Sequence, residues 1–251
     1  FLSLILLSSF TYCMQVYSAK LIDLTTIDDS YKIEDYTVPS FTQFLIAKET
    51  AKANPTDANM EALSQRIAEL KSYQYPYNVV VNINGDPTSR MAFAWYTNDR
   101  MTEGQLQLTP IADITNLATV FDTASEVITV TATPTPTKKS RYAIGASGIP
   151  AATGVPQSTK YKYTSHKAIA ENLIPNTTYA YRVGTDGYWS EVAYFTTAPK
   201  NEEDASEEFT FIYMTDSHIF NQTYVDDVRQ TATAAVTNIP DAKFCVFAGD
   251  H

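Results

Sequence analysis

Two apolar runs near the carboxyl end of the sequence are each followed by a short motif that contains aspartate and histidine. Asp216 and His218 follow the run 209–214, and Asp250 follows the run 244–248. Carboxylate oxygens and imidazole nitrogens are common ligands of divalent metal ions. Two such ions about 3.5–4 Å apart can neutralise a phosphate ester and promote deprotonation of a water near neutral pH. These residues are therefore candidates for a metal site that hydrolyses phosphate esters.

The segments around the motifs predict how they are positioned. Both runs are nearly continuously apolar, as expected of strands covered on both faces. Residues 224–237 between them have apolar side chains at helical spacing, and Pro240 ends the pattern. The apolar positions are Val225, Val228, Ala232, Ala235 and Val236. This order predicts a βαβ unit with parallel strands, so the three candidate ligands should emerge at one carboxyl edge.

The two motifs resemble those of the calcineurin-like metallophosphoesterases. That family reads Asp-x-His, then Gly-Asp-x-x-Asp or a variant, then Gly-Asn-His-Asp/Glu and later histidines. The resemblance implies that Asp216 and His218 bind the first of two divalent or mixed-valence ions (Fe, Zn or Mn), and that Asp250 bridges both. His251 matches no ligand of the pattern. The alternative is that Asp216 caps the following segment, His218 is a loop residue and Gly249-Asp250 is a turn.

The region before this unit resembles a fibronectin type III-like sandwich, most clearly over 166–184. A tyrosine corner, in which a Tyr hydroxyl bonds to upstream backbone, is expected at Leu173, Pro175, Thr177 and Tyr179. Such a module directly before a metallophosphoesterase domain is similar to the purple acid phosphatase arrangement. The resemblance covers residues 78–251 and is strongest after residue 160.

The first motif departs from the purple acid phosphatase pattern. Those enzymes usually carry Asp-x-Gly there, and a Tyr three residues after the Asp of the second motif binds a ferric ion. His218 stands in the Gly position, and the Tyr position lies beyond residue 251. A tyrosinate-bound ferric ion is therefore not implied, and the broader metallophosphoesterase family is favoured.

Period-two alternation predicts the sandwich strands. Val79, Val81 and Ile83 alternate, residues 84–87 form a turn, and Met91, Phe93 and Trp95 alternate back. This is typical of a hairpin, with Trp95 facing the core. Further strands are predicted at 105–108, 127–131, 160–163 and 191–199, and loops at 133–137 and 145–154.

Residues 28–71 are predicted to form a separate helical piece. A first helix is expected over 42–53, and Asp57 is expected to cap a second helix after Pro55. The apolar face of that second helix comprises Met60, Leu63, Ile67 and Leu70. The pair could pack on the sandwich or cover the phosphoesterase crevice. Packing on the sandwich is favoured, because apolar stripes are usually core.

The first 19 residues predict export. The apolar run 1–10 is too short to span a bilayer, and Ser18 and Ala19 offer a cleavage point before Lys20. The mature chain would have no transmembrane span and would be secreted, periplasmic or at the cell surface. Because an initiating Met and a basic n-region are missing, we expect the reading frame to begin upstream. The alternatives are a buried strand or a membrane anchor with a lipidated Cys13.

Composition gives no indication of a nucleic acid partner. The net charge of the 251 residues is −10, and no Lys/Arg cluster indicates nucleic acid binding. Beyond Cys13 the only cysteine is Cys245, so no disulfide is expected within the mature chain. Cys245 lies within an apolar run and is expected to be a small buried hydrophobe.

These elements predict a multidomain chain. Its parts are a signal peptide (1–19), a helical segment (20–77), a fibronectin III-like all-β sandwich of the purple acid phosphatase N-terminal kind (78–199), an acidic linker (200–208), and the first βαβ unit of a truncated α/β metallophosphoesterase domain (209–251). The linker is expected to be solvated, with a cation site as the less favoured alternative.

The resemblance implies an exported two-metal enzyme that hydrolyses phosphate mono- or diesters. We expect the present chain to be its amino-terminal part and inactive alone, because the later ligands and a histidine acid for the leaving alcohol are not in it. The alternative is a non-catalytic surface or adhesion protein that binds a partner or glycan through the fibronectin-like module.

Overall fold

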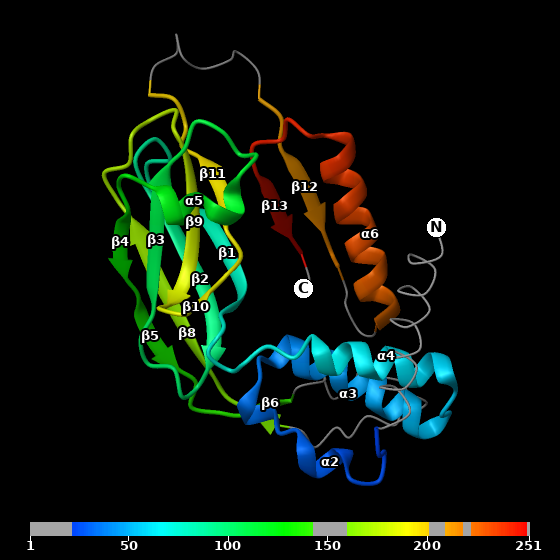
Figure 1. Ribbon diagram of the computed structural model, residues 1–251. Coiled ribbons are helices and arrows are strands. Elements are labelled where there is room, and N and C mark those ends of the chain that lie inside the picture. The colour runs from blue at the N-terminus through cyan, green and yellow to red at the C-terminus, as the bar shows by residue number, and fades with distance from the viewer. Residues whose placement is uncertain (1–21, 143–159, 201–208, 218–221, 250–251) are drawn as a thin grey trace, which may run out of the picture.

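The computed structural model describes residues 22–142, 160–200, 209–217 and 222–249 (Figure 1). It contains a β-sandwich, a group of helices below the sandwich in the view of Figure 1, and a strand, helix and strand on the right. The predicted signal peptide, the predicted loop at 145–154 and nearly all of the predicted acidic linker lie outside the described residues.

Two antiparallel sheets form the sandwich. The first has the order β1-β2-β8-β5, made of Tyr77–Ile83, Met91–Asn98, Tyr163–Ala170 and Thr133–Pro136. The second has the order β10-β9-β3-β4, made of Tyr188–Trp189, Thr178–Thr185, Gln105–Pro110 and Ile128–Thr131. β11, Ala193–Thr196, also pairs with β9. The turn η2 (Leu117–Thr119), the short helix α5 (Val120–Thr123) and the small pair β6 (Arg141–Tyr142) and β7 (Lys160–Tyr161) complete this part.

The predicted hairpin is confirmed. β1 pairs antiparallel with β2, and Met91, Phe93 and Trp95 are buried on the inner face of β2. They belong to one core with Leu106 and Leu108 of β3 and residues of β8 and β9. Burial of such large apolar side chains stabilises a fold by about 1.5–3 kcal/mol each, so this cluster holds the two sheets together.

The tyrosine corner is also confirmed. Tyr179 is 1% exposed, and its hydroxyl oxygen accepts a hydrogen bond of 3.0 Å from the backbone N–H of Ile174. The Thr197 hydroxyl donates to the Ile174 carbonyl at 2.7 Å. These bonds fix the chain where it crosses from β8 in one sheet to β9 in the other.

The predicted loop at 133–137 is wrong, because Thr133–Pro136 forms the edge strand β5 against β8. Pro134 and Pro136 have no N–H for a ladder, but they alternate with threonines. Thr137 continues the alternation of Thr133 and Thr135, and its N–H donates to Tyr163 O of β8 at 2.9 Å. The prolines therefore occupy the positions that face away from β8, as an edge strand permits. The predicted strand at 160–163 is divided between β7 and β8.

The helical segment contains α2 (Ile27–Ser30), η1 (Ile33–Asp35), α3 (Val38–Ala53) and α4 (Asp57–Ala68). α3 begins four residues before the predicted start, with a proline in its first turn, a position that tolerates proline. The cap of α4 is Thr56 rather than the predicted Asp57. Thr56 has extended backbone, and its side-chain oxygen accepts a hydrogen bond from the Asn59 N–H at 3.3 Å.

The apolar stripes of these helices are core, as expected, but they pack against one another, so the favoured packing of the stripes on the sandwich is wrong. Ile27, Phe41, Phe44 and Leu63 are buried in one cluster whose members all come from residues 22–70. Contacts of residues 20–77 to the sandwich include an edge-on contact of the Tyr75 and Tyr188 rings, with centroids 5.3 Å apart, and polar contacts. The Asn98 side-chain amide donates to Glu34 O at 3.4 Å, and a guanidinium nitrogen of Arg100 lies 3.4 Å from the Asp35 carboxylate.

The last part contains β12 (Ile212–Thr215), α6 (Gln222–Asn238) and β13 (Cys245–Ala248). β12 and β13 pair in parallel, with Ile212 opposite Cys245 and Thr215 opposite Ala248. Val225, Val228, Ala232 and Ala235 lie on the half-buried side of α6, as predicted, whereas Val236 is exposed. None of the helices within the described ranges is long and apolar enough to cross a membrane.

The prediction that both strands are covered on two faces is wrong for the described part of this unit. Ile212 is buried and α6 lies along β12 (Figure 1), but Phe209 and Tyr213 are 62% and 61% exposed. Cys245, predicted to be buried, is exposed as well. In the described residues this sheet has only two strands. Few elements therefore pack against it, and apolar side chains remain exposed.

Candidate metal centre

Asp216 lies directly after β12 and extends the pairing with β13 by one hydrogen bond. Its backbone N–H donates to the Ala248 carbonyl at 3.1 Å. Its φ is +51°, in the left-handed region that Asp and Asn enter more readily than other non-glycine residues. β12 therefore ends at Thr215, and Asp216 lies at the carboxyl edge of the small parallel sheet.

Gly249 occupies the corresponding place after β13. Its φ is +83°, a conformation that favours glycine. A Cβ at this position would lie 2.7 Å from Asp216 Oδ2 and 2.6 Å from Thr215 Oγ1. The absence of a side chain at Gly249 thus leaves the space that the Asp216 carboxylate occupies. That carboxylate packs against the residue that directly precedes Asp250 in sequence.

Thr215 orients the same carboxylate. Its hydroxyl donates a hydrogen bond to Asp216 Oδ2. A donor on the adjacent residue fixes the carboxylate without adding a charge, and such support is typical of acidic residues that serve as ligands. The roles of Thr215 and Gly249 were not predicted from the sequence. The available signal was a glycine and a hydroxyl residue directly before the two candidate aspartates.

The structure places one of the three predicted ligands. Asp216 is at the predicted carboxyl edge, whereas His218 and Asp250 lie outside the described residues. No group of three His, Cys, Asp or Glu side chains that could hold a metal occurs within the described ranges, which include only Asp216 of the predicted set. The convergence of all three ligands therefore stays a prediction.

The predicted donors and the described strand ends fit the predicted ions in two respects. The donor set predicted from the sequence, two carboxylates and one imidazole, suits Fe, Zn or Mn. The hydrogen bond from Asp216 to Ala248 also brings the two motif-bearing strand ends together at one edge, where open α/β sheets place their ligands.

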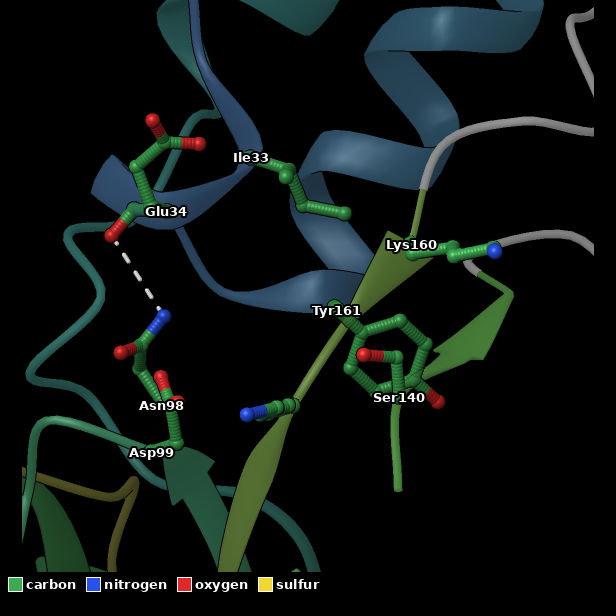
Figure 2. Close-up of a pocket in the computed structure, with 8 residues that line it drawn as sticks. Ile33, Glu34, Asn98, Asp99, Ser140, Lys160 and Tyr161 are labelled. Atoms are coloured by element: carbon green, nitrogen blue, oxygen red, sulfur yellow. Dashed lines mark hydrogen bonds between the residues drawn. The ribbon is translucent and has the colours of Figure 1, made fainter. Parts of the chain in front are cut away.

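A small pocket lies elsewhere, at the junction of the helical segment and the sandwich (Figure 2). It has a volume of about 140 Å³ and includes Glu34 of η1, Asn98 at the end of β2 and Lys160 of β7. In Figure 2 the Asn98 amide donates to the Glu34 carbonyl along one wall. No histidine lines this pocket and it does not include Asp216, so it is not the predicted metal centre.

Comparison with known proteins finds a family model that covers the sandwich. Residues 76–197 match the family model for the purple acid phosphatase N-terminal domain. Comparison with curated protein sequences finds no match.

Parts of solved structures are also similar to this chain, and two of them are named here. One is purple acid phosphatase PPD1 from yellow lupin (Lupinus luteus) seeds, at 14% identity over 57% of this chain and 23% of that chain, with a TM-score of 0.36. The other is the fn3 domain of human contactin 1, at 16% identity over 52% of this chain and 82% of that chain, with a TM-score of 0.28. The chain thus spans about a quarter of the length of the lupin protein.

Proposed function

We propose that this protein, in which residues 76–197 match the purple acid phosphatase N-terminal domain, is part of an exported metal-dependent phosphoesterase that hydrolyses phosphate mono- or diesters. The observation that carries the proposal is the position of Asp216. Its carboxylate packs against Gly249 at the carboxyl edge of two parallel strands, directly downstream of that domain in sequence.

Asp216, His218 and Asp250 would hold two divalent or mixed-valence ions, with Asp250 shared between them. The candidate ions are Fe, Zn or Mn, which carboxylate and imidazole donors suit. When bound, a pair of such ions neutralises the charge of the phosphoryl oxygens and makes a water acidic enough to ionise near neutral pH.

The contribution of the described residues is positioning. The Asp216 N–H bond to Ala248 fixes the distance between the two strand ends, and the Thr215 hydroxyl fixes the orientation of the Asp216 carboxylate. Gly249 removes the side chain that would displace that carboxylate. Small displacements of a ligand weaken catalysis strongly. Thr215, Ala248 and Gly249 would therefore support the site by positioning Asp216.

The proposed location is secreted, periplasmic or at the cell surface. The support for this is the apolar run at residues 1–10 with small residues before Lys20. Export would place the sandwich and the phosphoesterase part on the same side of the membrane.

The test is a set of single variants of the full-length gene product. D250N should abolish metal-dependent hydrolysis of a generic aryl phosphate with the fold intact, and D216A and H218A should lower metal content. D241N is the matched control, because Asp241 is an exposed carboxylate that precedes β13, whereas Asp250 follows this strand. Unchanged activity and metal content in D216A, H218A and D250N would overturn the proposal. A folded full-length protein without metal or turnover would favour the non-catalytic surface protein instead.

A further inference from the structure

The turn between β8 and β9 carries an acceptor sequence for N-linked glycans, Asn176-Thr177-Thr178. Asn-x-Ser/Thr is recognised when x is not proline. The sequence contains one other such triplet, which begins at Asn221, whereas Asn54-Pro55-Thr56 is excluded by its proline. We propose that Asn176 is N-glycosylated in a secretory compartment. This inference rests on the proposed export and adds a modification site to it.

The Asn176 side chain is available for modification. It is exposed, and within the described residues it makes no hydrogen bond or ion pair. The backbone is held separately, because the Asn176 N–H donates to Ala198 O at 3.1 Å and the Thr177 N–H donates to Thr197 Oγ1 at 3.0 Å. A glycan on the side-chain amide would therefore leave the bonds of this turn intact.

A turn requirement alone does not account for the whole triplet. Asn176 has φ +49°, a region that favours Asn over most residues. Asn172 in the same loop has φ +59° and is also exposed, but residues 173 and 174 are Leu and Ile. The hydroxyl residue Thr178 thus distinguishes Asn176 from a neighbour with the same backbone conformation.

The folded position of Thr178 indicates when the reaction takes place. Its hydroxyl lies 2.9 Å from the Thr196 hydroxyl across the β9 and β11 pair. This hydroxyl is therefore engaged once β11 has paired. Modification is expected before that pairing, while the chain enters the compartment in an extended form.

The transfer balances with a lipid-diphosphate-linked oligosaccharide as the donor. A bond forms between the Asn176 amide nitrogen Nδ2 and the anomeric carbon of the sugar. The bond from that carbon to a diphosphate oxygen breaks, the lipid diphosphate leaves, and Nδ2 loses one proton.

In the folded domain the glycan would lie two residues from Ile174, which is 60% exposed. It would shield this apolar side chain from association with other molecules.

The test expresses the chain behind a host leader in a eukaryotic secretory host, so that entry into the compartment does not depend on residues 1–19. N221Q is introduced throughout to leave Asn176-Thr177-Thr178 as the single acceptor. The secreted protein should carry a glycan that peptide-N-glycosidase removes, seen as a mobility shift and as conversion of Asn176 to Asp in the peptide mass. An unmodified Asn176 in the folded, secreted protein would overturn the proposal.

Matched variants locate the modification. N176Q and T178A should lose the shift, whereas T178S should retain it because Ser also completes the acceptor. N172Q should retain it as well, although Asn172 shares the loop and the backbone conformation. Loss of the shift in N172Q, or its persistence in N176Q, would contradict the assignment. Failure of the full-length gene product, with its own leader, to be exported would instead count against the proposed localisation.

Discussion

Trp95 and His166 stack in the core of the sandwich, with ring centroids 5.4 Å apart and planes inclined by 9°. Both side chains are fully buried. His166 Nε2 lies 2.8 Å from the Thr97 hydroxyl, whereas His166 Nδ1 and Trp95 Nε1 have no hydrogen-bond partner within the described structure. An imidazole is thus enclosed in the core without a counter-charge, which favours its neutral form.

We predict that this burial makes the sandwich sensitive to acid. Burial lowers the pKa of His166 from 6.5 to about 4, so the unfolded chain binds a proton at a higher pH than the folded chain. The stabilising contribution is present above about pH 6.5 and is lost as the pH falls toward 4, by at most about 3 kcal/mol. Denaturant unfolding at several pH values measures it. H166F removes this titration and should flatten the profile relative to wild type, and identical profiles would contradict the prediction.

Gly104 is predicted to be intolerant of a side chain because of the same pair. A Cβ there would lie 2.8 Å from His166 Nδ1 and 3.0 Å from Trp95 Cζ2. G104A should therefore destabilise the domain by about 1–3 kcal/mol through overpacking. A double-mutant cycle with H166A checks the cause, because removal of the imidazole should relieve most of the effect. Simple additivity of the two changes would show that the contact with His166 is not responsible.

The tyrosine corner gives a prediction about stability alone. Y179F removes the hydroxyl that accepts the Ile174 N–H and should lower the free energy of unfolding by about 1 kcal/mol. Y194F is the matched control, because Tyr194 is 48% exposed on the neighbouring strand β11. Equal effects of Y179F and Y194F in equilibrium unfolding would show that the buried hydrogen bond does not contribute.

Alternation of apolar and other residues predicted those strands of the sandwich in which position along the strand alone decides whether a side chain is buried. The alternation of Met91, Phe93 and Trp95 indicates that one face of the strand is buried. Any sheet packed against that face would bury it. β5 could not be predicted in this way, since Pro134 and Pro136 are typical of a loop and become acceptable only on an edge strand beside β8. Cys245 is exposed despite its apolar run, because burial likewise depends on neighbouring elements.

The candidate site could be predicted in part for a similar reason. An aspartate after an apolar strand is visible in sequence, and so Asp216 was placed at the correct edge. Its packing against Gly249 depends on the parallel register of β12 and β13, a contact between residues 33 positions apart in sequence (249 minus 216). No local pattern encodes that register, so the supporting roles of Gly249 and Thr215 emerged only from the fold.

Gly249 provides the sharpest test of the proposed metal centre. In the full-length protein G249A should displace the Asp216 carboxylate, because the added Cβ would lie 2.7 Å from Oδ2. We expect about a 10–100-fold loss of metal affinity, as for other residues that orient a ligand, measured by metal content after dialysis against a range of free metal concentrations. G187A is the matched control. Gly187 has a similar φ of +80°, but a Cβ there meets no atom within 4 Å, so it reproduces the backbone strain without the clash. If G249A and G187A retain metal equally well, Asp216 in the conformation described is not a ligand.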